Sequence, residues 1–311
     1  MPLISSTYNP SFFFKNKHIN TVYRTLFSNV NVNYKRKRFE TNDNDFIDVD
    51  FISKNSKELI LAIHGLEGSS DSSYIKSIAQ YSQKLNIDFA CMNLRGCSGE
   101  LNNQFSSYHS GKTEDLIFII NQLKEQYTSI HLLGYSLGAN LILKYLGETQ
   151  PSCCIKKAVA ISVPLDLTST SYQLSEKSNF IYLNRFMKSL KAKAIQKGIT
   201  HNKKSFVEKI KTASNFIDFD NLYTAPAHGF KDAHEYWDIN SSKYYVEKIT
   251  TPTLIINAKD DPFFREASFP YSMIKNLPQV YLERPKHGGH VGFNSSEKNW
   301  LEKRILNFFF E

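Results

Sequence analysis

The sequence has few cysteines and no long apolar run, and each shortage excludes a class of protein. It contains only four cysteines, at spacings that suit neither a zinc site nor a disulfide framework. No apolar run approaches the ~18 residues that a transmembrane helix needs, and no N-terminal segment has the layout of a secretory signal. We therefore expect a cytoplasmic protein without a transmembrane segment, whose thiols are reduced: Cys91, Cys97, Cys153 and Cys154.

Acidic residues are also in short supply, because 30 Asp and Glu stand against 38 Lys and Arg and leave a formal net charge of +8. Such an excess can indicate a nucleic acid or an anionic lipid as partner. The basic residues concentrate in residues 34–39 and 184–212, and neither stretch contains a recognisable nucleic-acid-binding motif. We therefore expect a solvated basic face and no nucleic-acid partner.

Short apolar runs that alternate with helical patterns dominate the rest of the chain. Six runs rich in Ile, Val and Leu are typical of strands buried on both faces. Segments of helical period separate the first four, and this alternation predicts an α/β fold with a mostly parallel central sheet flanked by helices. The predicted strands lie within residues 58–65, 88–96, 129–136, 157–164, 251–262 and 279–285, and the helices within residues 73–85, 114–127 and 137–147.

Residues near the N-terminus predict additions to this sheet. Residues 35–41 and 45–53 are joined by the turn-like NDN and predict an antiparallel hairpin at the sheet edge. Residues 9–27 combine aromatic with basic side chains, a composition that also suits a membrane surface. Their irregular apolar spacing instead favours a cover for the sheet edge.

The C-terminal residues predict a closing helix that packs on the sheet. Asn294 is a suitable N-cap, and Glu297 occupies the capping-box position three residues later. A single apolar stripe follows, formed by Trp300, Leu301, Ile305 and Phe308.

One interval interrupts the alternation of strands and helices. The strand that ends at Pro164 and the strand that begins near Thr253 are about ninety residues apart, whereas a crossover needs only a dozen or more. Residues 166–250 carry helical spacing, with Phe and Leu on one side and Lys on the other, and predict an inserted, mostly helical cap. Residues 1–165 and 251–311 then form the core of a single compact domain.

A serine lies between the third predicted strand and the helix that follows it. Ser136 is the centre of GYSLG, which fits the pattern G-x-S-x-G of a nucleophile on a tight turn. Gly134 and Gly138 suit this turn, because a Cβ at either position would crowd it. A single match to this pattern is weak evidence, but the strand before it and the helix after it supply the context that the chemistry requires.

A serine nucleophile needs a base and a carboxylate, in the chain order Ser, Asp, His. Asp261 and His290 follow later predicted strands, at the sheet edge where α/β proteins place their sites. Asp260 competes with Asp261, which is favoured because it directly precedes a proline, although the pattern leaves both open. His287 competes with His290, which is favoured by its glycine neighbours. The two histidines lack a third ligand at metal spacing, so no metal is expected.

The oxyanion of an acyl-transfer intermediate needs two hydrogen-bond donors. One donor in this kind of site is the backbone amide after the nucleophile, which here belongs to Leu137. The second comes from the loop after an earlier strand, here HGLEGSS, where the amide of Leu66 is the candidate and His64 and Gly65 shape the turn.

Three further residues have chemical side chains in loops. Arg95 could meet an acidic substrate, but a paired loop arginine is the favoured interpretation. Cys97 has no histidine tied to it by spacing, so a second nucleophile is not expected. His109 is expected to fix the loop before its helix.

Together these motifs resemble the YheT-like branch of the α/β-hydrolase superfamily, also called the AB hydrolase 4 family. The resemblance implies an α/β-hydrolase fold, a triad of Ser136, Asp261 and His290, and an insert that belongs to the family plan. It also implies an acyl-ester substrate, which members hydrolyse, form by acyl transfer or cleave from phospholipids. The motifs that carry it are HGLEGSSDSSY, MNLRGCSGELN, YHSGKTEDL, GYSLGANLILKYLGE, YTAPAHGFKDAHEYW, PTLIINAKDDPF and GGHVGF.

We therefore expect a serine hydrolase of the carboxylesterase type, which cleaves a small-molecule acyl ester through an acyl-enzyme and uses no cofactor. An acyltransferase, a phospholipase with the same triad and a non-catalytic binding module are the alternatives. A lipid substrate and peripheral membrane contact stay open, and the sequence does not fix the oligomeric state.

Overall fold

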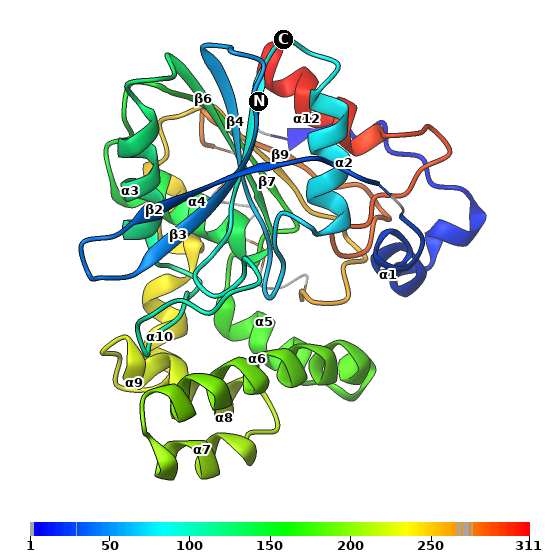
Figure 1. The fold of residues 1–311 in the computed structure, drawn as a ribbon. Coiled ribbons are helices and arrows are strands. Elements are labelled where there is room, and N and C mark those ends of the chain that lie inside the picture. The colour runs from blue at the N-terminus through cyan, green and yellow to red at the C-terminus, as the bar shows by residue number, and fades with distance from the viewer. Residues whose placement is uncertain (1–2, 29, 266–268, 270–273, 275) are drawn as a thin grey trace.

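A single mixed sheet forms the centre of the protein (Figure 1). The computed structural model describes residues 3–28, 30–265, 269, 274 and 276–311, and its strands are ordered β1-β9-β8-β7-β6-β4-β5-β3-β2. Neighbours from β1 to β5 are parallel, and β3 and β2 complete the sheet in antiparallel pairing. The strands are β1 (Leu3–Ile4), β2 (Lys35–Glu40), β3 (Phe46–Ile52), β4 (Glu58–Ile63), β5 (Asp88–Met92), β6 (Ser129–Tyr135), β7 (Ile155–Ile161), β8 (Thr253–Ile256) and β9 (Val280–Glu283).

Helices cover both faces of the sheet, so its central strands are buried on both sides. Leu59, Leu61 and Ile63 of β4 pack on the core shared with α3 and α4, whereas Ile60 and Ala62 face α2 and α12. This burial on both faces explains why the central strands are continuous apolar runs in the sequence. The predicted sheet and the predicted antiparallel hairpin are confirmed. The flanking helices are α2 (Ser73–Ser82), α3 (Thr113–Leu123), α4 (Leu137–Glu148) and α12 (Trp300–Phe310).

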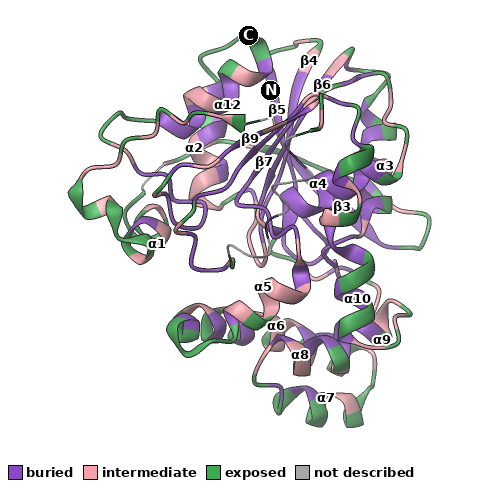
Figure 2. Ribbon diagram, turned by 180° about the vertical axis from the view of Figure 1, so that it is seen from behind, coloured by how far each residue is buried: buried purple, intermediate pink, exposed green. Residues whose placement is uncertain are grey.

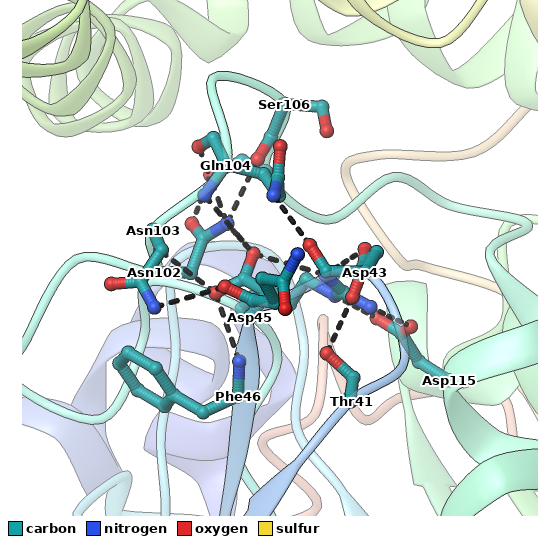
Figure 3. A network of polar contacts seen from close by, with 12 residues as sticks. Thr41, Asp43, Asp45, Phe46, Asn102, Asn103, Gln104, Ser106 and Asp115 are labelled. Carbon is teal, nitrogen blue, oxygen red and sulfur yellow. Dashed lines mark hydrogen bonds and ion pairs between the residues drawn. The ribbon is translucent and has the colours of Figure 1, made fainter.

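The turn of the β2–β3 hairpin is anchored by Arg95. Its guanidinium binds Asp115 through two hydrogen bonds of 2.7 and 2.8 Å, and it also donates to Asp43 at 2.7 Å and Asp45 at 2.9 Å. Figure 3 shows Asp45 accepting further bonds from Asn102 and its neighbours. Because its donors are used within the fold, Arg95 is a structural residue, as predicted.

The segment between β7 and β8 is helical and extends away from the sheet (Figures 1 and 2). We call residues 166–250 the helical insert, with the boundaries proposed from the sequence. The insert has an apolar cluster of its own, which includes Met187, Phe216 and Trp237. Its helices are α5 (Leu167–Leu174), α6 (Phe180–Thr200), α7 (Lys204–Lys211), α8 (Phe216–Phe219), the π-helical η3 (Asp220–Thr224), α9 (Ala225–Ala227) and α10 (Ala233–Asn240), with short 3-10 turns at Lys177–Asn179, Ser242–Tyr244 and Val246–Lys248.

The closing helix begins later than predicted. Asn294 does not cap it, because the Asn294 side chain bonds Asn20 near the N-terminus. Glu297 pairs with Lys303 at 2.6 Å instead of closing a capping box. The helix starts after Asn299, whose φ is 60°, and its buried stripe uses Phe309 where Phe308 was expected.

The N-terminal segment does more than cover the sheet edge. Only β1 extends the sheet, in parallel with β9. The 3-10 turn η1 (Phe12–Lys15) and helix α1 (Lys17–Phe27) follow, and Asn20 of α1 packs against the loop that carries His290. The edge cover predicted for residues 9–27 stays a prediction, and the contacts that the structure shows join α1 to the loop after β9.

Candidate active site

Ser136 occupies a strained turn between β6 and α4. Its φ and ψ are 51° and −116°, a conformation that is rare for a residue with a side chain. A Cβ on Gly134 would lie 2.5 Å from Ala139 Cα, and one on Gly138 would lie 2.4 Å from the carbonyl oxygen of Ile63. Both obstacles are backbone atoms, which cannot move aside. The two glycines of GYSLG are therefore required by space, and they hold the hydroxyl clear of the sheet.

Ser136, His290 and Asp261 form one chain of hydrogen bonds. The Ser136 Oγ lies 2.9 Å from His290 Nε2, and His290 Nδ1 lies 2.9 Å from Asp261 Oδ2. The carboxylate fixes the proton on Nδ1, which leaves Nε2 free to accept the serine proton. Burial raises the pKa of Asp261, and its contact with His290 opposes that rise. The other oxygen of Asp261 accepts the backbone N–H of Phe263 at 2.9 Å.

The two competing residues from the sequence pair with each other. Asp260 Oδ2 lies 3.3 Å from His287 Nδ1, and its Oδ1 accepts the backbone N–H of Gly289 at 3.0 Å. The side chains of Asp260 and His287 are 19% and 23% exposed, whereas Asp261 is 1% exposed. The structure thus brings Asp261 to His290 and uses Asp260 to brace the same loop.

Two glycines beside His290, Gly289 and Gly292, make room for helix α1. A Cβ on Gly289, whose φ is 58°, would lie 2.5 Å from the carbonyl oxygen of Lys17, and one on Gly292 would lie 2.1 Å from that of Asn20. Close packing lets Thr21 Oγ accept the backbone N–H of His290 at 2.9 Å, while the same hydroxyl donates to the carbonyl of Lys17. Thr21 therefore contributes to the position of His290.

The turn predicted to carry the oxyanion donor lies against the nucleophile. A Cβ on Gly65 would be 3.1 Å from Ser136 Cβ. His64 is buried and accepts the N–H of Leu94 at Nε2, so its Nδ1 donates to the carbonyl of Gly65 at 2.8 Å. Burial lowers the pKa of His64 to about 4, which keeps this bonding pattern at neutral pH. Leu66 and Leu137, whose amides are the candidate donors, line the same cavity as Ser136.

Sequence reasoning missed Glu67, which follows the candidate amide of Leu66. Its φ is 54°, and its N–H donates to the Tyr108 oxygen at 3.0 Å while the Tyr108 hydroxyl donates back to its carboxylate at 2.8 Å. Ser189 and Lys193 of α6 also bind this carboxylate. Glu67 thereby ties the insert to the turn beside the nucleophile. Glu67 lies in the motif HGLEGSS and Tyr108 in YHSGKTEDL. These two motifs could therefore have indicated that both residues belong to the site.

Two hollows meet at Ser136 and His290. The first is lined mainly by apolar side chains of the insert, and its polar end holds Asp220, whose pKa burial raises to about 6. The second lies between α1, the turn after β4 and α6, and most of the residues that line it are polar by type, many with hydroxyl groups, so we call it the polar hollow. Apolar residues of the first hollow include Leu167, Leu174, Leu190, Phe216, Phe219 and Trp237; polar residues of the second include Thr25, Ser69, Ser72, Ser73, Lys76 and Arg185.

The other chemical residues have structural surroundings. Cys97 is buried, and burial raises the pKa of its thiol to about 12, which argues against a nucleophile. His109 accepts the N–H of Gly111 at 3.1 Å and packs against His228, so it fixes the loop before α3 as expected. Within the described residues, no group of three or more His, Cys, Asp and Glu side chains could hold a metal ion. None of the described helices is both long and apolar enough to cross a membrane.

Comparison with known proteins shows which families the chain is similar to. A family model described as alpha/beta hydrolase fold matches residues 58–295. "Putative esterase YheT" of Escherichia coli is 33% identical over 315 residues, which cover 97% of this chain and 92% of YheT. "Monoacylglycerol lipase" of Saccharomyces cerevisiae is 28% identical over 270 residues, which cover 82% of this chain and 60% of that enzyme.

The fold itself recurs in solved structures. The esterase Pf2001 of Pyrococcus furiosus superposes with a TM-score of 0.59 at 17% identity, over 89% of this chain and 90% of the esterase. At this identity the likeness concerns the fold, whereas the family match and the YheT alignment span most of the sequence. The chain is therefore a YheT-like member of the α/β-hydrolase fold family.

Proposed function

We propose that this protein is a carboxylic ester hydrolase in which Ser136 is the nucleophile, His290 the general base and acid, and Asp261 the carboxylate that orients the histidine. The observation that carries the proposal is the unbroken path of two 2.9 Å contacts from Ser136 through His290 to the buried Asp261. This geometry supports turnover over a binding-only module, because a binding site has no need of a base in contact with a strained serine.

Acylation follows from these contacts. As Ser136 Oγ bonds to the ester carbonyl carbon, His290 Nε2 takes the hydroxyl proton, and the ionised Asp261 stabilises the imidazolium. The amides of Leu66 and Leu137 receive the negative charge that develops on the carbonyl oxygen. When the C–O bond breaks, His290 returns the proton to the leaving alcohol, and the acyl group stays on Ser136.

Deacylation uses the same groups in reverse. A water molecule loses its proton to His290 Nε2 and attacks the acyl carbon, and Ser136 leaves with that proton. The hydroxyl-rich second hollow favours water over an apolar alcohol as the acceptor. Hydrolysis is therefore preferred to acyl transfer, and these steps need no cofactor.

The two hollows divide the substrate. The apolar hollow suits the acyl chain, because burial of each methylene from water is worth about 0.8 kcal/mol. The polar hollow suits an alcohol that carries hydroxyl groups of its own. An ester between an aliphatic acid and a polyol fits both, and the lipase name of the yeast relative agrees with this class.

A matched series of esters tests the proposal. We expect the wild type to hydrolyse p-nitrophenyl esters with an optimum at an acyl length that fills the apolar hollow, and to prefer a glycerol ester over an ester of a long-chain alcohol with the same acyl group. Ser136→Ala should lose about 10⁴-fold or more in kcat. Thr170→Ser, a mild change in the lining of the apolar hollow, is the control for expression and folding. Hydrolysis that survives in Ser136→Ala at the wild-type rate would refute the assignment of the nucleophile.

A further inference from the structure

Helix α1 is amphipathic in the reverse sense, with its polar face against the protein. Asn20 is fully buried, where its side chain accepts the N–H of Asn294 at 2.9 Å and donates to the Tyr8 hydroxyl at 2.9 Å. One turn later Arg24 pairs with the buried Glu302 at 2.5 Å. Buried polar contacts thus fix the inner side of α1, and its large apolar side chains Ile19, Tyr23, Leu26 and Phe27 are exposed.

The outward side of this segment carries large apolar side chains. Ile19, Tyr23, Leu26 and Phe27 recur at the spacing of one helix face. The 3-10 turn before the helix exposes two more aromatic rings. Scattered exposed apolar residues are ordinary, but a contiguous group of them marks an interaction surface. The exposed fractions are 80% for Phe12, 71% for Phe13, 66% for Leu26 and 69% for Phe27.

The first turn of α6 extends this group from the helical insert. His18 of α1 stacks on Tyr182 of α6, with His18 Nδ1 3.1 Å from the Tyr182 hydroxyl. The two residues before Tyr182, Phe180 and Ile181, are 60% and 77% exposed. Figures 1 and 2 show α1 and one end of α6 on the same side of the molecule. We call Phe12, Phe13, Leu26, Phe27, Phe180 and Ile181 the α1–α6 rim.

The two segments that carry the rim lack acidic residues. Residues 1–39 contain no Asp or Glu, and neither do residues 177–207, which include the whole of α6. Lys15, Lys17 and Arg185 are exposed beside the apolar side chains. Exposed aromatic rings beside these cations are complementary to anionic lipid headgroups above an apolar layer. The carboxylates of the adjoining hollow, Glu67 and Asp71, belong to the turn after β4 and not to the rim segments.

The rim also borders the opening of the proposed active site. Thr21, Val22 and Thr25 of α1 line one wall of the polar hollow, and Tyr182 and Arg185 of α6 line another. That hollow reaches Ser136 and His290. A lipid surface in contact with the rim would therefore face the route to the nucleophile.

We propose that the α1–α6 rim docks this protein on an anionic phospholipid bilayer, with the apolar side chains in the headgroup region and Lys15, Lys17 and Arg185 on the phosphates. The docked enzyme takes its ester from the bilayer without full passage of the acyl chain through water. Docking itself needs no chemistry at Ser136, so it is tested separately from hydrolysis.

Vesicle sedimentation in a Ser136→Ala background tests docking without turnover. We expect binding to mixed phosphatidylcholine–phosphatidylglycerol vesicles, and weaker binding to phosphatidylcholine alone. The double variant Leu26→Ser, Phe27→Ser should weaken binding about tenfold or more, because two apolar side chains that would insert into the bilayer are replaced by polar ones. Ile199→Ser with Ile239→Ser removes two side chains of 57% and 45% exposure outside the rim, and should leave binding unchanged. Lys15→Glu with Lys17→Glu should abolish the preference for anionic vesicles.

Each version is also made with Ser136 intact and assayed on p-nitrophenyl acetate, whose turnover reports folding. The proposal would be overturned if the Ser136→Ala protein with an intact rim bound the mixed anionic vesicles no better than it binds vesicles of phosphatidylcholine alone. Equal binding by the rim pair and the control pair would overturn it as well. A dimer that the rim substitutions dissociate, together with no vesicle binding, would assign the rim to a second copy of the chain instead.

Discussion

Two acid–histidine pairs lie side by side in this protein and come from the same two loops. Asp261 and His290 are 2.9 Å apart and continue to Ser136, whereas Asp260 and His287 are 3.3 Å apart and continue to the backbone of Gly289. The first pair is almost fully buried, and the second is about one-fifth exposed. Both pairs consist of an aspartate and a histidine. They differ in burial and in the group that each contacts next, which is the Ser136 hydroxyl for the proposed catalytic pair and the Gly289 backbone for the other.

The difference shows how one loop is held from two sides. Asp260 binds the N–H of Gly289, and Thr21 of α1 binds the N–H of His290, the next residue. Backbone contacts on both sides leave the imidazole of His290 little freedom, which favours the serine contact. The outer pair thus supports the inner pair, and neither Asp260 nor His287 is among the residues that line the two hollows.

Substitution of the histidines should give the largest contrast. We expect His290→Gln to lower kcat on a p-nitrophenyl ester about 10⁵-fold or more, because no other group can take the Ser136 proton. His287→Gln should change kcat by less than about tenfold. Initial rates give kcat, and matched circular dichroism spectra check that both variants fold. An equal loss of kcat in both variants would contradict the different roles assigned to the two pairs.

Substitution of the acids should give the next contrast. Asp261→Asn is expected to lower kcat about 10⁴-fold, since the amide does not stabilise the imidazolium. Asp260→Asn keeps an acceptor for the N–H of Gly289 and should cost less than about tenfold. If the Asp260 variant were instead the slower enzyme, the acid would have to be reassigned.

The hydroxyl of Thr21 offers a smaller effect on the inner pair. Thr21→Val leaves the N–H of His290 without its acceptor, at a cost of about 1–3 kcal/mol, and kcat should fall about tenfold. Thr21→Ser retains the hydroxyl and should restore most of the rate. A valine variant with wild-type kcat and an unchanged pH profile would show that α1 does not position the histidine.

The smallest effect concerns stability. Burial raises the pKa of Asp261 above its ordinary value, so the folded protein holds this proton more tightly than the unfolded chain does. The favourable contribution of this group is therefore complete below the ordinary pKa and is lost as pH rises through the raised one. Asp261→Asn should increase the free energy of unfolding by about 0.5–2 kcal/mol at pH 7.

Denaturant titrations across pH check the sign. The gain from Asp261→Asn should shrink as the pH falls below about 4, the ordinary pKa of an aspartate, where the wild-type carboxyl becomes protonated in both states. Asp260→Asn is the matched control and should shift stability by less than about 0.5 kcal/mol at either pH. A gain that grew as the pH fell would contradict the stated direction.

Much of this arrangement was predictable because it follows from local patterns. The apolar runs predicted the sheet, and GYSLG predicted the turn at Ser136, since both depend on sterics within a few residues. Asp261 and Asp260 could only be ranked, because adjacent residues point to opposite sides and their burial depends on distant packing. The pattern likewise gave no sign of the Asp260–His287 pair.

Contacts between the two ends of the chain were beyond the reach of these patterns. Asn294 looked like a helix cap but bonds Asn20, 274 residues away. No sequence pattern indicates that Thr21 contacts His290, because this contact forms only when α1 packs on the loop that carries His290. Of the glycines around His290, Gly289 and Gly292 admit the backbone of α1, whereas Gly288 lies against Phe293 and Ala258. The sequence pattern does not reveal these neighbours.

The most direct test of the proposed mechanism is to label the protein with a fluorophosphonate and locate the adduct by peptide mass spectrometry. We predict one adduct per chain, on Ser136, at similar rates in the wild type and His287→Gln and strongly slowed in His290→Gln. An adduct on another residue, or labelling that depends on His287 and not on His290, would contradict the assignment of Ser136, His290 and Asp261 as the catalytic residues.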